Sequence, residues 1–410
     1  MKGFVVGVKD LYRVRQKILR NDIILKMSAD ARRARWGVVM LFWLNGVAWS
    51  SILPRYPEIK ESLRLDDQWW GIAVAIGPVG GLVAGLVTAA LIRRYSSAWV
   101  GIAMLNLIGN APAAWVFAVG VFLMASLDAL TDISMNAHGL RVQELYGRPI
   151  LNSFHGWWSI GAVCGGFIGS AARQAGIPVW AQCVAATVVF GGMSLGAKTL
   201  LLPGLDHDPQ AERSRKQRRR RIPTGTVVRL AALGLLGASA GLMEDTGSTW
   251  GAIYLDRQFE VIPFVAGMAF VGLQGAQLIG RFTGDALVSR IGPRFAVVQG
   301  GIIAFLGMGL SLIWPSPTTA ILGFACVGWG VATAIPSAMH AADELPDMNH
   351  GDGLMIVTWM MRIGFFAGPP LIGALSEATD LRLALWVVPA FAVVILALSP
   401  SLGRSVGGRR

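Results

Sequence analysis

The chain has 410 residues, of which 54% are hydrophobic and only 15% are charged, and its mean hydropathy is +0.54. A water-soluble protein of this size needs more polar residues to cover its surface, so the composition excludes a soluble globular protein and indicates an all-α membrane protein. The net charge of +12 does not indicate nucleic-acid binding, because the basic residues lie between and outside the apolar stretches, where they suit anionic lipid headgroups.

Residues 1–35 form a basic arm ahead of the first apolar stretch. We expect no cleavable signal peptide, because the apolar run that begins near Trp36 is long enough to cross a membrane. Two interpretations of the arm remain open. Either it is a loosely amphipathic segment on the inner membrane surface, or translation begins at Met27.

The apolar stretches that follow predict twelve transmembrane helices, since roughly 20 apolar residues cross a bilayer. The predicted spans are 36–54, 69–92, 98–112, 114–141, 150–173, 177–202, 226–254, 263–288, 294–314, 318–341, 353–375 and 381–400. A basic segment over 204–224, which we interpret as a solvated linker, separates a first six-helix half (36–203) from a second (225–401), and 402–410 form a tail.

Lysine and arginine are distributed unevenly among the predicted loops. If the N-terminus is cytoplasmic, the inner segments hold 26 of these residues and the outer loops hold 6. Because positive residues accumulate on the cytoplasmic side, both termini are predicted to be cytoplasmic, with the protein in the inner membrane.

The two halves also share short patterns at nearly constant offsets. The clearest is Ile160-Gly161 with Gly165, which matches Ile363-Gly364 with Gly368 at an offset of 203. Such matches indicate a duplicated six-helix unit, the parallel-repeat arrangement of transporters whose halves rock about a midplane site. We expect the small-residue faces to be close-packing surfaces. Trp49 and Trp250, at the ends of corresponding helices, are interpreted as interfacial anchors.

A polar stripe stands out within the fourth span. Asp128, Asp132 and Asn136 are spaced four residues apart, so they share one face of a helix. A carboxylate at the bilayer centre costs at least about 2.5 kcal/mol, so such groups normally face a bundle interior or a water-filled cavity. Arg362, inside the eleventh span, falls near the depth of Asp132 and is its expected partner. The alternative is a static salt bridge that only joins the halves.

Further candidates flank this stripe. Glu244 and Asp245 lie deep in the seventh span, and at least one should face the cavity and exchange protons. His155 is placed near the depth of Asn136 by the hairpin turn; it either exchanges protons or packs as a hydrogen-bonded histidine. Gln274 and other amides of the eighth span supply neutral hydrogen bonds or pack between helices.

Several segments together resemble the major facilitator superfamily, and most closely its YbjJ-like branch of bacterial inner-membrane transporters. The matching segments are Asp132–Gly139, Gly147–Pro149, Ser153–Gly156, Ser159–Gly161, Arg55–Pro57, Glu244 followed by Trp250, Gly280–Gly284 and Gly368–Pro370. The resemblance covers nearly all of the chain from Trp36 onward and implies a twelve-helix transporter. It also favours Glu244 over Asp245 as the cavity residue.

The sequence departs from the superfamily pattern at the expected cytoplasmic gate. The loop after the second span carries Arg93 where the family has an acid and Ser96 where it has a glycine. On the second half, Asp285 lies one turn before the corresponding position, so we expect the gate there to be formed by Arg281, Asp285 and Arg290.

These features predict a monomeric secondary transporter that moves a small solute by alternating access, coupled to protons at Asp132 or Glu244. No ATP-binding motif is present, no metal-ligand spacing joins the three cysteines, and we expect no cofactor and no enzymatic activity. Two alternatives remain: a transporter-like sensor, and a serine hydrolase suggested by the G-x-S-x-G pattern around Ser239. The sequence leaves the substrate and the direction of transport open.

Overall fold

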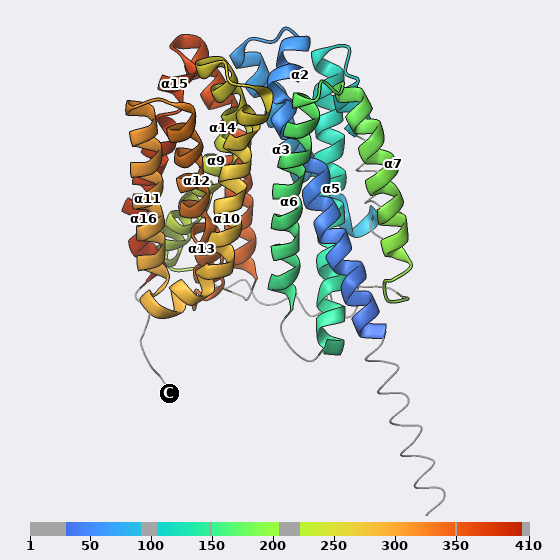
Figure 1. Cartoon of the computed structure of the whole chain (residues 1–410). Coiled ribbons are helices and arrows are strands. Elements are labelled where there is room, and N and C mark those ends of the chain that lie inside the picture. The colour runs from blue at the N-terminus through green and yellow to red at the C-terminus, as the bar shows by residue number, and fades with distance from the viewer. Residues whose placement is uncertain (1–29, 92–104, 147–149, 205–221, 349–350, 404–410) are drawn as a thin grey trace, which may run out of the picture.

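The computed structural model describes residues 30–91, 105–146, 150–204, 222–348 and 351–403. Within these ranges the chain is helical and contains no strand. Helices of the first half and helices of the second half form two bundles that stand side by side (Figure 1). We call the end that carries α2 and α15 the α2 end, and the end where the described chain begins and finishes the terminal end.

The first half begins with a helix over residues 30–50. Its other elements are η1 (Leu53–Arg55), α2 (Tyr56–Ser62), α3 (Asp67–Leu91), α5 (Ala114–Tyr146), α6 (Leu151–Gln174) and α7 (Val179–Lys198). The second half consists of α9 (Thr224–Phe259), α10 (Pro263–Ile291), α11 (Pro293–Ile313), α12 (Pro317–Ala332), α13 (Ala334–Asp343), α14 (Asp352–Ala378), α15 (Leu381–Ala384), α16 (Val387–Leu398) and η2 (Ser399–Leu402).

The observed helices follow the predicted spans closely. In the described part of the chain, nine helices are long and apolar enough to cross a membrane. The predicted span 98–112 lies mostly outside the described residues, so the count of twelve stays a prediction. Two spans are interrupted, between α12 and α13 and between α15 and α16. Pro336 and Pro389 explain the breaks, because each lacks the N–H that would bond the carbonyl four residues earlier.

Glycines set the distance between neighbouring helices. A β-carbon at Gly161, Gly165 or Gly169 of α6 would clash with backbone oxygens of the first helix or the turn that follows it. In the second half, a β-carbon at Gly364 of α14 would clash with the backbone of α9 at Ala238. The predicted close-packing faces are therefore confirmed at these positions, because only glycine permits backbone contact.

The two halves also pack directly against each other. Helix α3 lies against α14, where a β-carbon at Gly71 would clash with the carbonyl of Pro369, and one at Gly373 with the carbonyl of Asp67. Helix α6 lies against α10, where Gly267 is in contact with Ser170. These contacts lie toward the α2 end and bring the first and second halves close together there.

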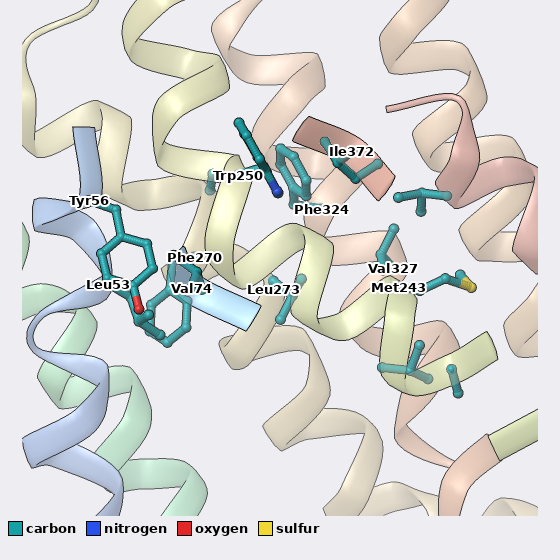
Figure 2. Packing of buried hydrophobic residues seen from close by; sticks show 14 of the residues in the cluster. Leu53, Tyr56, Val74, Met243, Trp250, Phe270, Leu273, Phe324, Val327 and Ile372 are labelled. Atoms are coloured by element: carbon teal, nitrogen blue, oxygen red, sulfur yellow. The ribbon is translucent and has the colours of Figure 1, made fainter. Parts of the chain in front are cut away.

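The apolar core is continuous across both halves. Figure 2 shows Leu53, Tyr56 and Val74 of the first half beside Phe270 of the second. Trp250 is fully buried in the same cluster, near Phe324. The expectation that Trp250 is an interfacial anchor is therefore wrong. The ring fills the interior of the second half, although the periodic pattern alone placed it at a helix end.

Candidate functional site

A cavity of about 310 Å³ lies between the halves, bordered by the first helix, η1, α2, α3, α5, α6, α9, α10 and α14. Five charged residues contribute to its lining: Asp128 and Asp132 from the first half, and Glu244, Asp245 and Arg362 from the second. Four of these five were candidate residues from the sequence, and Asp245 was the open alternative to Glu244. The structure places both members of that pair at the cavity.

The acidic pair of the first half is held by amide side chains. Asp128 accepts a hydrogen bond from Asn45 Nδ2 at 2.6 Å, and Asn45 Oδ1 in turn accepts one from Trp158 Nε1 at 2.7 Å. Asp132 accepts a hydrogen bond from Asn136 Nδ2 at 2.9 Å. Asn136 is therefore a support for Asp132, because it does not itself belong to the cavity lining. The four-residue spacing on α5 aligns the carboxylates as the sequence predicted.

Arg362 reaches across the interface from α14. Its Nη1 lies 2.9 Å from the position that a β-carbon on Gly81 of α3 would occupy. The guanidinium interacts electrostatically with Asp128 and Asp132. Among the described residues, however, no carboxylate oxygen lies within 4.0 Å of the Arg362 guanidinium nitrogens, and no residue forms a hydrogen bond with this side chain. The expected partners are near, but a direct salt bridge is not formed in this conformation.

The acidic pair of the second half has fewer partners. Glu244 is 8% exposed as a whole residue, and among the described residues no hydrogen bond or ion pair reaches its carboxylate. Asp245 accepts one long hydrogen bond, from Thr249 Oγ1 at 3.4 Å. Gln274 of α10 also lines the cavity, and its carbonyl oxygen lacks a donor although the residue is only 4% exposed.

Aromatic side chains form much of the remaining wall. Trp49, Trp158, Tyr56, Phe270 and Phe365 line the cavity from both halves. Trp49 is thus a cavity residue rather than the interfacial anchor that its position near a helix end suggested. A cavity with apolar walls and a few convergent polar groups is the usual form of a small-molecule site.

His155 does not reach this cavity. Its side chain is exposed, and its ring meets the ring of Phe42 edge-on with centroids 5.1 Å apart. The structure therefore places His155 outside the lining, and among the described residues its side chain makes no hydrogen bond, so it also differs from the hydrogen-bonded packing histidine that the sequence left open. The hairpin argument concerned only the depth of His155 along the helix and gave no information about which side of α6 it occupies.

The expected gate of Arg281, Asp285 and Arg290 is not assembled in the described part of the chain. Asp285 and Arg290 are exposed, and no described residue forms an ion pair with either. Arg281 crosses the interface instead: it donates to Ser159 Oγ at 3.0 Å and lies 5.7 Å from the centre of the Trp158 ring. The corresponding loop of the first half, with Arg93 and Ser96, lies outside the described residues.

A second charged cluster, at the α2 end, was missed by the sequence analysis. Asp67 accepts two hydrogen bonds from Arg257, at 2.7 and 2.8 Å, one from Ser376, and an ion pair from Lys60 at 2.9 Å. Beside it, Arg173 pairs with Asp256 at 2.9 Å. We call these residues the α2-end network. No spacing rule connects residues so far apart in the chain.

Asp67 precedes the apolar stretch of α3, at the surface end of the helix. Burial alone would raise the pKa of its carboxyl, but the hydrogen bonds from Arg257, Ser376 and Lys60 and the charge of Arg257 outweigh that effect and lower the pKa to about 2. The charged form of Asp67 therefore stabilises a contact between the first and second halves.

Sequence comparisons identify relatives over most of the chain. It is 27% identical to the uncharacterized transporter y4wD of Sinorhizobium fredii, over 89% of this chain and 97% of that protein. It is also 27% identical to the membrane protein MosC of Rhizobium meliloti, over 91% of each chain. An uncharacterized MFS-type transporter of Yersinia pestis is 25% identical over 89% of this chain and 94% of that protein. Residues 233–404 match the model of the Major Facilitator Superfamily.

The second half of the chain therefore matches the Major Facilitator Superfamily, and relatives along nearly the whole chain include an MFS-type transporter. The fold of this chain is shared by transporters of known structure. The nucleoside transporter NupG, crystallised as a point mutant, superposes with a TM-score of 0.70 at 15% identity, covering 90% of this chain and all of the other. A bacterial homologue of the lysosomal transporter Spinster, inward-facing and occupied, gives 0.65 at 16% identity over 93% and 96% of the two chains.

These matches identify a multi-pass membrane transporter rather than an enzyme. The side-chain geometry agrees with this at the G-x-S-x-G pattern. Ser239 is fully buried within α9, and its hydroxyl donates to the carbonyl of Leu235 one turn earlier. A nucleophile on an elbow needs an exposed hydroxyl at a strand-to-helix turn. The hydrolase alternative is therefore wrong.

Proposed function

We propose that this transporter moves a small solute across the inner membrane by alternating access, driven by the proton gradient, and that it works as a monomer. The observation that carries the proposal is the position of the charges. Acidic groups of the first half and Arg362 of the second half share one cavity without forming a direct ion pair among the described residues. Buried charges that are not paired within the protein mark substrate or proton pathways in membrane proteins.

Proton binding at Asp128 or Asp132 would change the attraction between the halves. The two carboxylates lie on α5, whereas Arg362 lies on α14. A carboxylate and a guanidinium about 4 Å apart attract by about 4 kcal/mol at an effective dielectric constant of about 20. Gaining or losing one proton therefore alters the energy of bringing the halves together around the cavity. Such a difference is sufficient to couple protonation to a rocking motion.

The topology of the chain supports an inward-facing state for this conformation. The α2 end is assigned to the outside, because the described helix ends that adjoin the Lys- and Arg-rich segments of the sequence lie at the terminal end. The α2-end network and the tight contacts of α3 with α14 then close the outer side. The cavity would exchange solute with the cytoplasm until the network opens.

Proton release from detergent-solubilised protein tests this proposal. Pools of small amines, neutral alcohols and carboxylic acids are added at fixed pH, and a pH indicator reports protons released by wild type and by Asp132→Asn. Glu144→Gln is the matched control, since it removes an exposed carboxylate from the same helix. We expect release in wild type and in the control but not in Asp132→Asn. Equal release in all three proteins would contradict coupling at Asp132.

A further inference from the structure

We propose that Glu244, Asp245 and Gln274 form a subsite for a protonated amine, so that the transported solute is an organic cation. The inference rests on the proposed function, in which the cavity is the transport pathway. It assigns the two acidic pairs of the cavity to different tasks. The pair on α5 serves proton coupling, and the pair on α9 binds the solute.

Glu244 supplies the first argument. The residue is more than nine-tenths buried and borders the cavity, yet no described residue donates a hydrogen bond or a positive charge to its carboxylate. The carboxylate oxygens are not among the buried atoms without a partner, so they remain accessible from the cavity. Because the described residues provide neither a donor nor an opposite charge, the cavity occupant is the available partner. A protonated amine provides both the charge and the N–H donors.

Gln274 supplies an independent argument from a different helix. It lies on α10, is 4% exposed, and its carbonyl oxygen lacks a donor among the described residues. An unsatisfied buried acceptor is costly, typically by about 1–3 kcal/mol. Because this oxygen has almost no accessible surface, a solute can donate to it only after the Gln274 side chain turns toward the cavity. Three N–H groups of one ammonium can be shared between a carboxylate and an amide oxygen, whereas an ionised carboxylate ligand would have no donor to offer.

The geometry of α9 favours an organic cation over a bare metal ion. Glu244 and Asp245 are consecutive, so their side chains leave the helix about 100° apart and do not face each other. Both side chains nevertheless border the cavity, so they enter it from different directions. A single small ion cannot contact both carboxylates closely, but a solute of several atoms can. Trp49 and Phe270 provide aromatic surface for its hydrocarbon part and for its charge.

The acidic pair on α5 is a poorer amine site. Asp128 and Asp132 already accept hydrogen bonds from Asn45 and Asn136, and Arg362 stands near both. The guanidinium would repel an ammonium at this position. Because the carboxylates on α5 have partners and those on α9 have few, the positive charge of the solute is expected near α9. The carboxylates on α5 then remain available for proton binding.

A matched set of six-membered-ring compounds tests the proposal by the thermal stability of the purified full-length protein. Cyclohexylammonium chloride, cyclohexanol, sodium cyclohexanecarboxylate and sodium chloride are compared at equal ionic strength. We expect the amine alone to raise the melting temperature, by about 2 °C or more. Glu244→Gln and Asp245→Asn should each abolish the shift, and Asp132→Asn should keep it. The use of two variants guards against one that fails to fold.

Each other result overturns the inference. An equal shift with cyclohexanol would mean that the cavity selects shape rather than charge, and a shift with sodium chloride would indicate a metal-ion site. A larger shift with the carboxylate would place recognition at Arg362, and no shift with any compound would remove the subsite. Failure of the proposed function is distinguishable. It would appear as amine stabilisation that persists while solute-induced proton release is absent from wild type.

Discussion

Charged residues behave differently in two regions of this transporter. At the α2 end, Asp67, Arg257, Lys60, Arg173 and Asp256 all take part in ion pairs of 2.7–2.9 Å. In the cavity, no acidic residue lies within ion-pair distance of a described cation. Both regions join the first and second halves. At the α2 end, ion pairs are formed. In the cavity, charged residues of the two halves lie near one another without forming ion pairs.

This difference indicates two roles for buried charge. Paired charges lower the energy of one arrangement of the halves, so they act as a latch that must break when the arrangement changes. Unpaired charges carry a desolvation cost that a proton, a solute or a movement of the partner can relieve. The α2-end network is thus suited to stabilising one arrangement of the halves. The cavity charges are suited to controlling when the protein changes to the other arrangement.

The largest effect is expected from Arg362→Met. This substitution removes the cation that the described residues contribute to the cavity lining, so Asp128 and Asp132 should hold their protons more tightly. Solute-induced proton release at neutral pH should fall by about 100-fold, the upper part of the usual range for coupling between sites. Arg362→Lys, which keeps the positive charge, should reduce proton release by less. Unchanged release in Arg362→Met would show that the cavity charges are not coupled.

An intermediate effect is expected from Asp67→Asn. A pKa lowered from 3.8 to about 2 corresponds to about 2–3 kcal/mol of stabilisation by the charged form, or roughly 60-fold in population. The α2 end should open more often, and a cysteine placed at Ser248 in the cavity should react faster with an impermeant maleimide from outside. Glu61→Gln, which removes a nearby exposed carboxylate, is the control. Equal labelling in both variants would contradict the latch.

The same carboxyl predicts a dependence on pH. Because the pKa of Asp67 is lowered in the native protein, its stabilisation is fully present above about pH 3.8 and is lost as the pH falls toward 2. The distance between spin labels at the exposed residues Ser62 and Gln258 should therefore lengthen as the pH is lowered through this range. In the Asp67→Asn background this pH-dependent lengthening should be absent, since no titrating group remains at that position.

The smallest effect is expected from Arg173→Gln. Arg173 pairs with Asp256, whose side chain is 32% exposed, and such partly exposed pairs contribute about 0–1 kcal/mol. A double-mutant cycle with Asp256→Asn, read by the same outside labelling, should give a coupling energy within that range. A coupling as large as the effect of Asp67→Asn would mean that the two ion pairs share the latch equally.

Much of the fold was predictable because the membrane imposes a simple rule. Each helix must be apolar over about 20 residues, so the boundaries of α5, α9 and α14 followed from hydropathy. The cavity residues were predictable for the same reason, since an acid such as Asp132 or Glu244 is exceptional in such a stretch. The glycine faces were predictable because close backbone contact excludes any side chain.

The remaining features depend on packing between distant segments. Asp67 and Arg257 are 190 residues apart, and neither stands inside an apolar span, so nothing in the sequence marks them as partners. Trp250 and His155 show the opposite difficulty. The sequence identified each residue as part of a helix, but whether each side chain faces the core, the cavity or the surroundings depends on the rotation of the helix against its neighbours.

The central claim is that the α2-end network holds one state of an alternating cycle. Distances between spin labels test it most directly, in a background without native cysteines, with one pair at Ser62 and Gln258 near the α2 end and another at Glu144 and Glu344 near the terminal end; all four positions are exposed. We predict that Asp67→Asn lengthens the first distance and shortens the second. Lengthening at the α2 end with no shortening at the terminal end would contradict the account.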